Sequence, residues 1–511
     1  MKSLKAFREE THYYRTLMNA IVGITSVSAF VLAAFIIFLI ESHNARALLF
    51  LSIFTTGVIG LVLSVALAAS MKRSKLHITP FEVLGLKQYW GWQTPDDRLL
   101  IAAIVAVVSV TIIAIFLEIV EIYINERPIK NFLTPVSTNN LLNPSHNSLT
   151  SITVLIPARN EELSLPLTLA SLQEQTRPPD KIIVVADNCT DSTSSIAIEM
   201  GYQVFETVGN TERKAGALNQ ALASILPAMG RHDVILVMDA DSQINDDFLA
   251  NAAESFHNFP DLDAVGGVFF GEKGRGILGQ LQRNEFTRYS DQIKRRGGRV
   301  FVLTGTASLF RARALSTVAK ARGTYIPGQT GQVYDTAALT EDNELTIALK
   351  TLGCPMISPP ECRVTTELMP TWKSLWGQRI RWQRGAIENL GAYGFTRTTM
   401  RYWGQQIAIA YGAIALSSSL ILTLVVLLLQ DHWVWYPFWI TIGGIFALER
   451  IWTVRKGGRA AVLLALPIVL ELAFDIFLQL VFVKVLFDVA VMRRSRWASV
   501  KHTALDSVVG S

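Results

Sequence analysis

The chain has 511 residues and a formal net charge of +5, and 50% of its residues are hydrophobic while only 17% are charged. This composition is far from that of an average soluble protein, and the length leaves room for several domains. The three cysteines have no metal-ligand spacing and form no even set, which favours a reduced, cytosolic setting over a disulfide framework.

Apolar runs are concentrated at the two ends of the chain. The first three are Met18–Ile40, Ala47–Ser70 and about Leu99–Ile122, each near the roughly 20 residues that a helix needs to cross a bilayer. We expect residues 1–150 to form a transmembrane region with a linker and without a cleavable signal peptide. If all three runs cross, the basic loop after the second run lies outside, against the positive-inside tendency, so the number of spans stays open.

The middle of the chain, residues 151–385, carries most of the charge and no such run. Strand patterns near 151–158, 181–187, 202–206 and 234–239 alternate with helix patterns near 162–173, 192–200 and 214–226. Repeated strand and helix units indicate an α/β fold with a mainly parallel sheet and right-handed crossovers. The sequence therefore predicts a soluble α/β domain between two α-helical transmembrane blocks.

Two loops after predicted strands carry polar residues. The first strand ends at Pro157 and is followed by Asn160 and Glu161, and the second ends at Asp187 and is followed by Asp191. Because the carboxyl ends of parallel strands meet at one edge of the sheet, where open α/β folds bind ligands, these side chains are candidates for a binding site. Capping of the next helix would also account for either loop alone.

A third strand end carries two carboxylates. The apolar strand that begins near Ile235 ends in Asp239-Ala240-Asp241. Two carboxylates so close together repel one another unless a cation offsets their charge, and hard oxygen ligands suit Mg²⁺ or Mn²⁺ bridging a diphosphate. For an isolated motif of this kind, a strand that runs into an Asx-turn is the alternative.

Seven segments occur in an order that resembles family 2 inverting glycosyltransferases with a GT-A (Rossmann-like) fold: IPARNEE, ADNCTD, ERKAGALNQAL, DADSQ, TGTASLF, TEDNEL and QRIRW. The last segment resembles the Q(Q/R)xRW signature of the processive membrane synthases of cellulose, hyaluronan and poly-N-acetylglucosamine. The resemblance covers about Ser151 to Gly385. The chain departs from the pattern at Ala186-Asp187, where many members have two successive acids, and no C-terminal domain of the PilZ type is found.

The resemblance assigns roles at the sheet edge. It places Asp187 against the uracil of a UDP-sugar, and Pro157 and Glu161 beside it in the nucleotide site. Lys214 lies at a predicted helix start, where a cation and the helix N-terminus both favour the diphosphate. Asp239 and Asp241 are the expected ligands of Mg²⁺ or Mn²⁺, with Asp239 also contacting the nucleotide.

Asp342 of Thr340-Glu341-Asp342 resembles the general base of these enzymes. A single carboxylate aligned opposite the leaving group suits direct displacement with inversion. Thr340 is also expected to cap a helix that has the two acids in its first turn.

The segment TWKSLWGQRIRWQRGAIENL has Trp and Arg residues at helical spacing and predicts an amphipathic helix at the membrane interface. The resemblance implies that Trp382 stacks on the acceptor sugar and that Gln378, with Arg379 or Arg381, approaches UDP. The alternative is a helix that only anchors the domain.

The C-terminal part is expected to return to the membrane. Residues 386–492 contain apolar runs that start near Ile407, Trp433 and Ala461, and Ala461–Met492 is interrupted by ionisable residues, which favours a tilted span joined to an interfacial helix. Basic residues cluster beside the runs, a pattern that indicates anionic lipid head groups and no nucleic acid.

The last segment, residues 493–511, is a basic tail. Trp497, Lys501 and His502 offer one stacking face and two phosphate donors, so the tail is a candidate gate over the nucleotide. A disordered anchor is the simpler alternative.

The sequence thus predicts a multipass membrane hexosyltransferase with a cytosolic catalytic domain in the plasma or inner membrane. The donor is a UDP-sugar, and the acceptor is a growing β-linked polysaccharide that is exported through the membrane helices. One alternative is a single transfer to a polyprenyl or other lipid acceptor. Another is a transporter with a nucleotide-sensing domain.

Overall fold

The computed structural model describes residues 151–429 and 437–491. The predicted N-terminal spans and the tail with Trp497, Lys501 and His502 lie outside these residues. The chain divides into two compact units. The described residues of one unit are 151–400 and 450–471, and those of the other are 401–429, 437–449 and 472–491.

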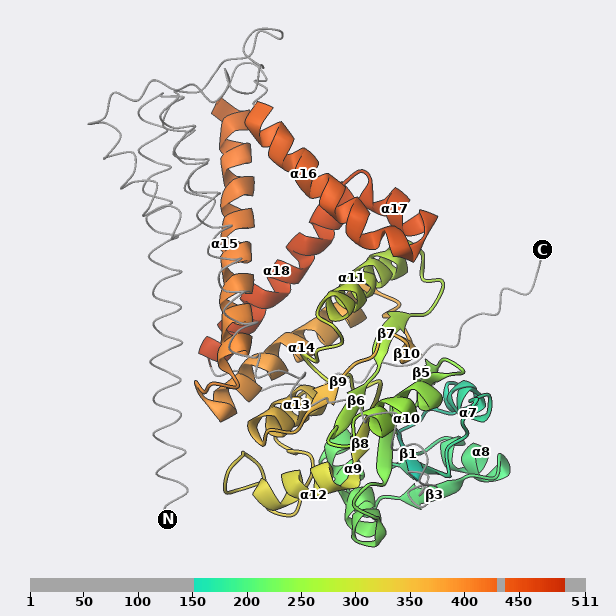
Figure 1. Cartoon of the computed structure of the whole chain (residues 1–511). Helices are drawn as coiled ribbons and strands as arrows, with labels where there is room; N and C mark the ends of the chain where they lie inside the picture. Colours follow the sequence, from blue (N-terminus) through green and yellow to red (C-terminus); the bar gives the residue numbers. More distant parts are fainter. Residues whose placement is uncertain (1–150, 430–436, 492–511) are drawn as a thin grey trace, which may run out of the picture. The chain divides into compact units, whose positions relative to one another are not determined.

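The α/β part of the chain begins with four strands that alternate with helices, as the sequence predicts (Figure 1). The elements up to residue 400 are β1 (Ile152–Ala158), α7 (Leu165–Gln173), β2 (Lys181–Ala186), α8 (Thr193–Glu199), β3 (Gln203–Glu206), α9 (Arg213–Ile225), β4 (Val234–Met238), β5 (Ser242–Ile244), α10 (Phe248–Asn258), β6 (Ala264–Gly266), β7 (Val268–Gly271), α11 (Gly276–Arg295), β8 (Ala307–Arg311), α12 (Ala312–Ala321), α13 (Glu341–Thr351), β9 (Met356–Ile357), β10 (Arg363–Thr366) and α14 (Trp372–Tyr393).

The main sheet has seven strands in the order β3-β2-β1-β4-β8-β6-β9. β1 pairs in parallel with β2 and β4, and β2 pairs in parallel with β3. β8 runs antiparallel to both of its neighbours, β4 and β6. The prediction of a mainly parallel sheet is therefore confirmed, with β8 as the exception.

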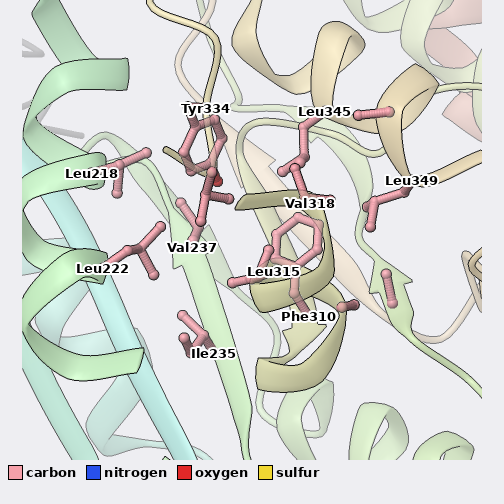
Figure 2. Close-up of a cluster of buried hydrophobic side chains, with 14 of the residues drawn as sticks. Leu218, Leu222, Ile235, Val237, Phe310, Leu315, Val318, Tyr334, Leu345 and Leu349 are labelled. Atoms are coloured by element: carbon pink, nitrogen blue, oxygen red, sulfur yellow. The ribbon is translucent and has the colours of Figure 1, made fainter. Parts of the chain in front are cut away.

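Both faces of the sheet are covered by helices. Every residue of β4 is buried, as expected for a strand with no solvent-facing side. Side chains of α9, α12 and α13 pack on one face, and Figure 2 shows this core around Val237 and Phe310. Side chains of α7, α8 and α10 pack on the other face around Val154 and Leu236. This two-sided packing fixes where β4 ends and therefore where Asp239 lies.

A second sheet has three short strands in the order β5-β10-β7. β10 is antiparallel to β5 and parallel to β7, so strands about a hundred residues apart in sequence lie side by side. α11 packs beside this sheet through Phe286, whose ring meets Phe269 edge to face at 4.8 Å. The sequence patterns did not predict this sheet.

The remaining described α-helices are α15 (Met400–Leu429), α16 (Pro437–Val454), α17 (Arg459–Ala465) and α18 (Val469–Ala490), and the two short 3-10 helices are η3 (Leu226–Ala228) and η4 (Arg455–Gly457). Among the described residues, no single helix meets both the length and the apolarity expected of a membrane span. One pair of helices, α17 and α18, meets them together and is bent by 79° at the break between the two.

Candidate active site

The site is centred on a lysine held between two carboxylates from different elements. Lys214, in the first turn of α9, places Nζ 2.6 Å from Oδ1 of Asp239, which directly follows β4. The same Nζ lies 3.0 Å from Oε1 of Glu341, the first residue of α13. Three segments that the sheet brings together thus share one charge cluster.

The charges in this cluster set one another's protonation. Burial disfavours the charge on Lys214, but Asp239 and Glu341 outweigh it and hold the pKa of Lys214 well above its ordinary value. Burial likewise opposes ionisation of Glu341, but Lys214, the helix backbone and Arg381 lower the pKa of Glu341. Lysine and glutamate therefore remain an ion pair at neutral pH.

Asp342 differs from its neighbour. Burial, together with the negative charge of Glu341, raises the pKa of Asp342 to about 6. Its Oδ2 accepts a hydrogen bond of 3.2 Å from the Gly305 backbone N–H, and its Oδ1 accepts one of 2.8 Å from the Asn343 N–H. A Cβ at Gly305 would lie only 3.2 Å from that Oδ2, so glycine lets the backbone approach the carboxylate closely. An oriented carboxylate that titrates near neutrality is suited to accept a proton.

The loop after β2 holds a second buried carboxylate. Asp187 is 4% exposed, and its Oδ1 accepts hydrogen bonds from Asn188 Nδ2 at 2.9 Å, Thr207 Oγ1 at 3.0 Å and Asn210 Nδ2 at 2.8 Å. Among the described residues no hydrogen bond reaches Oδ2. The carboxylate is thus fixed through one oxygen and retains acceptor capacity on the other.

The loop after β1 is tied to α8. Pro157 is half-buried near the end of β1, where it pairs with Val185. The Glu161 N–H donates to Thr193 Oγ1 at 2.8 Å, and its Oε2 accepts from Ser164 Oγ at 2.5 Å. Through these contacts Glu161 connects the loop after β1 to the start of α8, and none of them joins Glu161 to the Lys214 cluster.

α14 carries the QRIRW segment and is anchored to the start of α13. It begins with a capping box formed by Thr371 and Ser374. Asn389 Nδ2 donates to both Oγ1 and the carbonyl oxygen of Thr340, each at 3.2 Å. A Cβ at Gly385 would lie 2.3 Å from Thr340 Oγ1, so only glycine allows this contact.

The two arginines of this segment face different surroundings. Arg381 is close enough to Glu341 for its charge to lower the pKa of that carboxyl. Arg379 is 5% exposed, and its Nη2 donates to Glu285 Oε2 of α11 at 2.6 Å. The Arg379 guanidinium also lies 4.3 Å from the ring centre of Trp382. Of the two arginines, Arg381 is the one whose charge acts on Glu341 of the Lys214 cluster, whereas Arg379 pairs with Glu285.

The other two residues of the segment lie beside Arg379. Gln378 Oε1 accepts a hydrogen bond of 3.3 Å from Arg379 Nη1. Trp382 is 36% exposed, so part of the side chain is accessible to a ligand. A partly exposed indole of this kind can receive a sugar ring.

The metal-ligating prediction rests on Asp239 and Asp241. In the part of the chain that the structure describes, no group of three or more His, Cys, Asp or Glu residues could hold a metal ion. Asp241 Oδ1 accepts a 3.2 Å hydrogen bond from Ser242 Oγ. Two hard carboxylates fit Mg²⁺ or Mn²⁺ only if a ligand such as a diphosphate adds further oxygens, which is usual for Mg²⁺.

Sequence reasoning missed a buried ion pair next to the base. Arg322 and Glu344 are 0% and 1% exposed, and both guanidinium Nη atoms reach the carboxylate, at 2.5 Å and 2.7 Å. Tyr393 of α14 donates a third bond to Glu344, at 2.5 Å. Glu344, the third acid of TEDNEL, was the only sequence signal for this pair, since nothing in the sequence links Glu344 to an arginine 22 residues earlier.

One family model matches the middle of the chain. Residues 150–385 match the family described as "Glycosyltransferase like family 2". These residues are a family 2 glycosyltransferase domain. The predictions of that family and of a GT-A type α/β fold are confirmed for this domain.

The family 2 domain also matches curated proteins. Poly-beta-1,6-N-acetyl-D-glucosamine synthase of Staphylococcus epidermidis is 26% identical over 274 residues, which cover 52% of this chain and 60% of that protein. The enzyme of the same name from Staphylococcus aureus strain COL is 26% identical over 250 residues, 48% of this chain and 56% of that protein. The chain thus spans less than two thirds of the length of these relatives.

One solved structure similar to this chain is mannosyltransferase PcManGT from Pyrobaculum calidifontis, in complex with GDP-Man and Mn²⁺. It has 19% sequence identity and a TM-score of 0.42, and the match covers 61% of this chain and 85% of that chain.

Proposed function

We propose that this protein transfers a sugar from a UDP-sugar, with inversion, to the end of a growing β-linked polysaccharide at a membrane. The names of the curated relatives favour N-acetylglucosamine as the sugar. The observation that carries the proposal is the arrangement of Asp342, with its pKa raised to about 6, beside the Lys214–Asp239 pair. A proton acceptor and a phosphate-binding cation lie at one sheet edge, as a transfer between two bound substrates requires.

The donor half of the site follows from charge and hydrogen bonding. The free oxygen of Asp187 can accept the imide N–H of uracil, while Lys214 and the N-terminus of α9 favour the diphosphate. To receive the diphosphate, Lys214 must exchange at least part of its contact with Asp239 for phosphate oxygens. A divalent metal held by Asp239 and Asp241 would supply charge stabilisation to the leaving UDP.

The acceptor half is built on Asp342 and Trp382. Asp342 takes the proton of the acceptor hydroxyl as that oxygen attacks the anomeric carbon, and the bond to UDP breaks on the opposite side. The partly exposed indole of Trp382 offers a platform for the acceptor sugar. Arg381 acts from the same helix on Glu341, and its charge favours a nearby diphosphate.

Membrane embedding and export belong to the same proposal. They are supported by the apolar runs of the N-terminal and C-terminal parts and by the basic residues beside them. The catalytic domain is then cytosolic, since nucleotide sugars are made there. A reporter fused after Gly230, which precedes β4, should give a cytosolic signal, and an external signal would overturn the mechanism.

The decisive experiment uses the purified full chain with a panel of UDP-sugars and Mn²⁺, and measures both UDP release and product size. The proposal predicts UDP release with one preferred sugar and a product of many sugars. A product limited to one added sugar on a lipid would favour the non-processive alternative. Binding of a UDP-sugar without UDP release would favour a nucleotide-sensing transporter.

A further inference from the structure

Thr340 directly precedes α13, the helix whose first turn carries the proposed base Asp342. Thr340 is 7% exposed, and within the described part of the chain its hydroxyl forms no capping hydrogen bond to α13, so the expected side-chain cap is not formed. The hydroxyl accepts a hydrogen bond from Asn389 of α14 instead. The start of the helix that carries the base is therefore held by another helix.

The contact between Asn389 and Thr340 is buried. Asn389 is 3% exposed, and its Nδ2 donates to both the hydroxyl and the carbonyl oxygen of Thr340, each at 3.2 Å. A Cβ at Gly385, one turn before Asn389, would lie 2.3 Å from the Thr340 hydroxyl oxygen, so the two helices approach each other closely here. The Thr340 carbonyl also accepts the Glu344 N–H at 3.1 Å, which is the first-turn hydrogen bond of α13 itself. Asn389 therefore fixes where α13 lies and is not needed to form it.

The base helix is held on another side by the loop before β8. The Gly305 N–H donates to Asp342 Oδ2 at 3.2 Å. The Leu303 N–H donates at 2.9 Å to the hydroxyl of Thr346, one turn further along α13. Asp342 is thus placed by two contacts, one from the α/β core and one from α14 through Thr340.

α14 also carries the proposed acceptor platform. Trp382 and Asn389 are seven residues apart on this helix. That spacing places them about 20° apart around the helix axis and about 10 Å apart along it. The same face of α14 therefore carries Trp382 and grips the start of α13. Because a helix is stiff over two turns, the contact at Asn389 sets the distance between Trp382 and Asp342.

We propose that Asn389 is a positioning residue: through Thr340 it holds Asp342 where the carboxylate meets the hydroxyl of an acceptor sugar on Trp382. The assignment rests on the proposed function and adds to it a link between the acceptor platform and the base. A general base must lie within hydrogen-bond reach of the attacking hydroxyl, and a displacement of about 1 Å can reduce the rate about 100-fold. A water molecule can follow a displaced carboxylate, whereas a sugar stacked on Trp382 cannot.

The test compares Asn389→Ala with Asn284→Ala in the full chain. Asn284 of α11 is 0% exposed, and its Nδ2 also donates to two acceptors outside its own helix, Glu471 Oε1 at 2.8 Å and the Ala461 carbonyl at 3.3 Å. Each variant loses two buried hydrogen bonds, so both should lower Tm to a similar extent. Incubation with Mn²⁺ and UDP-N-acetylglucosamine labelled in the sugar measures UDP release and sugar incorporated into product. Calorimetry with the same donor and no acceptor measures donor binding.

For Asn389→Ala we expect sugar incorporation to fall about 10- to 100-fold. UDP release should fall less, because water replaces the acceptor hydroxyl, so the ratio of UDP released to sugar incorporated should rise. Donor binding should match that of wild type, since Asn389 acts on the acceptor half of the site. Asn284→Ala should leave the ratio and the incorporation at wild-type values.

Two milder variants change the other end of the contact. Thr340→Val removes the hydroxyl and keeps the shape of the side chain and the carbonyl contact, so the ratio should rise less than in Asn389→Ala. Thr340→Ser keeps the hydroxyl, and its ratio should be closer to that of wild type than the ratio of Thr340→Val. If Asn389→Ala does not fold, this second pair decides the assignment by the same ratio.

Three results would overturn the assignment: a wild-type ratio in both Asn389→Ala and Thr340→Val, an equal rise of the ratio in Asn284→Ala, or a loss of donor binding in Asn389→Ala as large as its loss of incorporation. If the wild-type protein neither releases UDP nor incorporates sugar, the proposed function itself fails and this assignment fails with it. If wild type does both, only the role of Asn389 is at stake.

Discussion

Neutralising Glu344 should unfold the protein at a markedly lower temperature. In Glu344→Gln the side chain keeps its size, but Arg322 loses its only carboxylate partner among the described residues while remaining 0% exposed. Its bonds to the carbonyl groups of Pro327 and Val333 persist and cannot neutralise the charge. A buried guanidinium without a counter-charge is strongly unfavourable.

The expected magnitude follows from measurements on buried pairs. Removal of one partner from a buried ion pair costs about 3–5 kcal/mol in the free energy of unfolding. For a domain of this size, each kcal/mol lowers Tm by about 2–4 °C, so Tm should fall by about 6–20 °C. The loop that carries Val333 should loosen as well, because the same arginine donates to the Val333 carbonyl.

The matched control is Glu388→Gln, on α14. Glu388 pairs with Arg384 at 2.6 Å one helical turn away, but its side chain is 36% exposed. Exposed pairs at this spacing contribute about 0.3–0.5 kcal/mol, so Tm should change by at most a few degrees. Tryptophan fluorescence during heating of the full-length chain measures both variants. Equal Tm values for Glu344→Gln and wild type would refute the account of the buried pair.

Three other predictions concern the site. The pKa of Asp342 is raised to about 6 in the folded protein. Protonation of Asp342 therefore stabilises the fold fully below about pH 4, and this contribution is lost as pH rises through about 6. Asp342→Asn should therefore have a higher Tm than wild type above pH 6 and the same Tm near pH 4; a lower Tm at both values would be inconsistent with the raised pKa. Lys214 lowers the pKa of Asp342, so the pKa of Asp342 should rise in Lys214→Met. The acidic side of the pH–rate profile should then shift to higher pH, and donor binding should weaken. An acidic side that stays at the same pH would contradict the shared cluster. Gly385→Ala should destabilise the domain and reduce transfer, because the added Cβ would collide with Thr340. The control Gly377→Ala, on the same helix, meets nothing within 4 Å and should stabilise the domain by about 0.5–1 kcal/mol. Similar Tm values for the two variants would count against the close contact between Gly385 and Thr340.

Much of the α/β domain could be predicted because its strands are long, apolar runs bounded by polar loops. β1 and β4 needed only the local pattern, and the positions of Asp187 and Asp239 followed from where their strands end. β5 and β10 have three and four residues and pair across the chain, Val364 opposite Ile244, so no local pattern identifies them.

Side-chain direction on α14 was harder to predict. Arg379 and Arg381 are two positions apart, which separates them by about 200° around a helix, so they face nearly opposite sides. The sequence left both open as UDP-binding candidates. The packing of Gly385 and Asn389 against Thr340 turns Arg381 toward Glu341, and this contact depends on tertiary structure.

The pair of variants that most directly tests the central claim is Asp241→Asn and Asp342→Asn, each assayed for UDP-sugar binding and for UDP release. A site divided into a donor half and a base predicts that Asp241→Asn weakens donor binding and that Asp342→Asn preserves it. Both should reduce turnover by about 100-fold or more. Near-normal UDP release from either variant would contradict the assignment of the site.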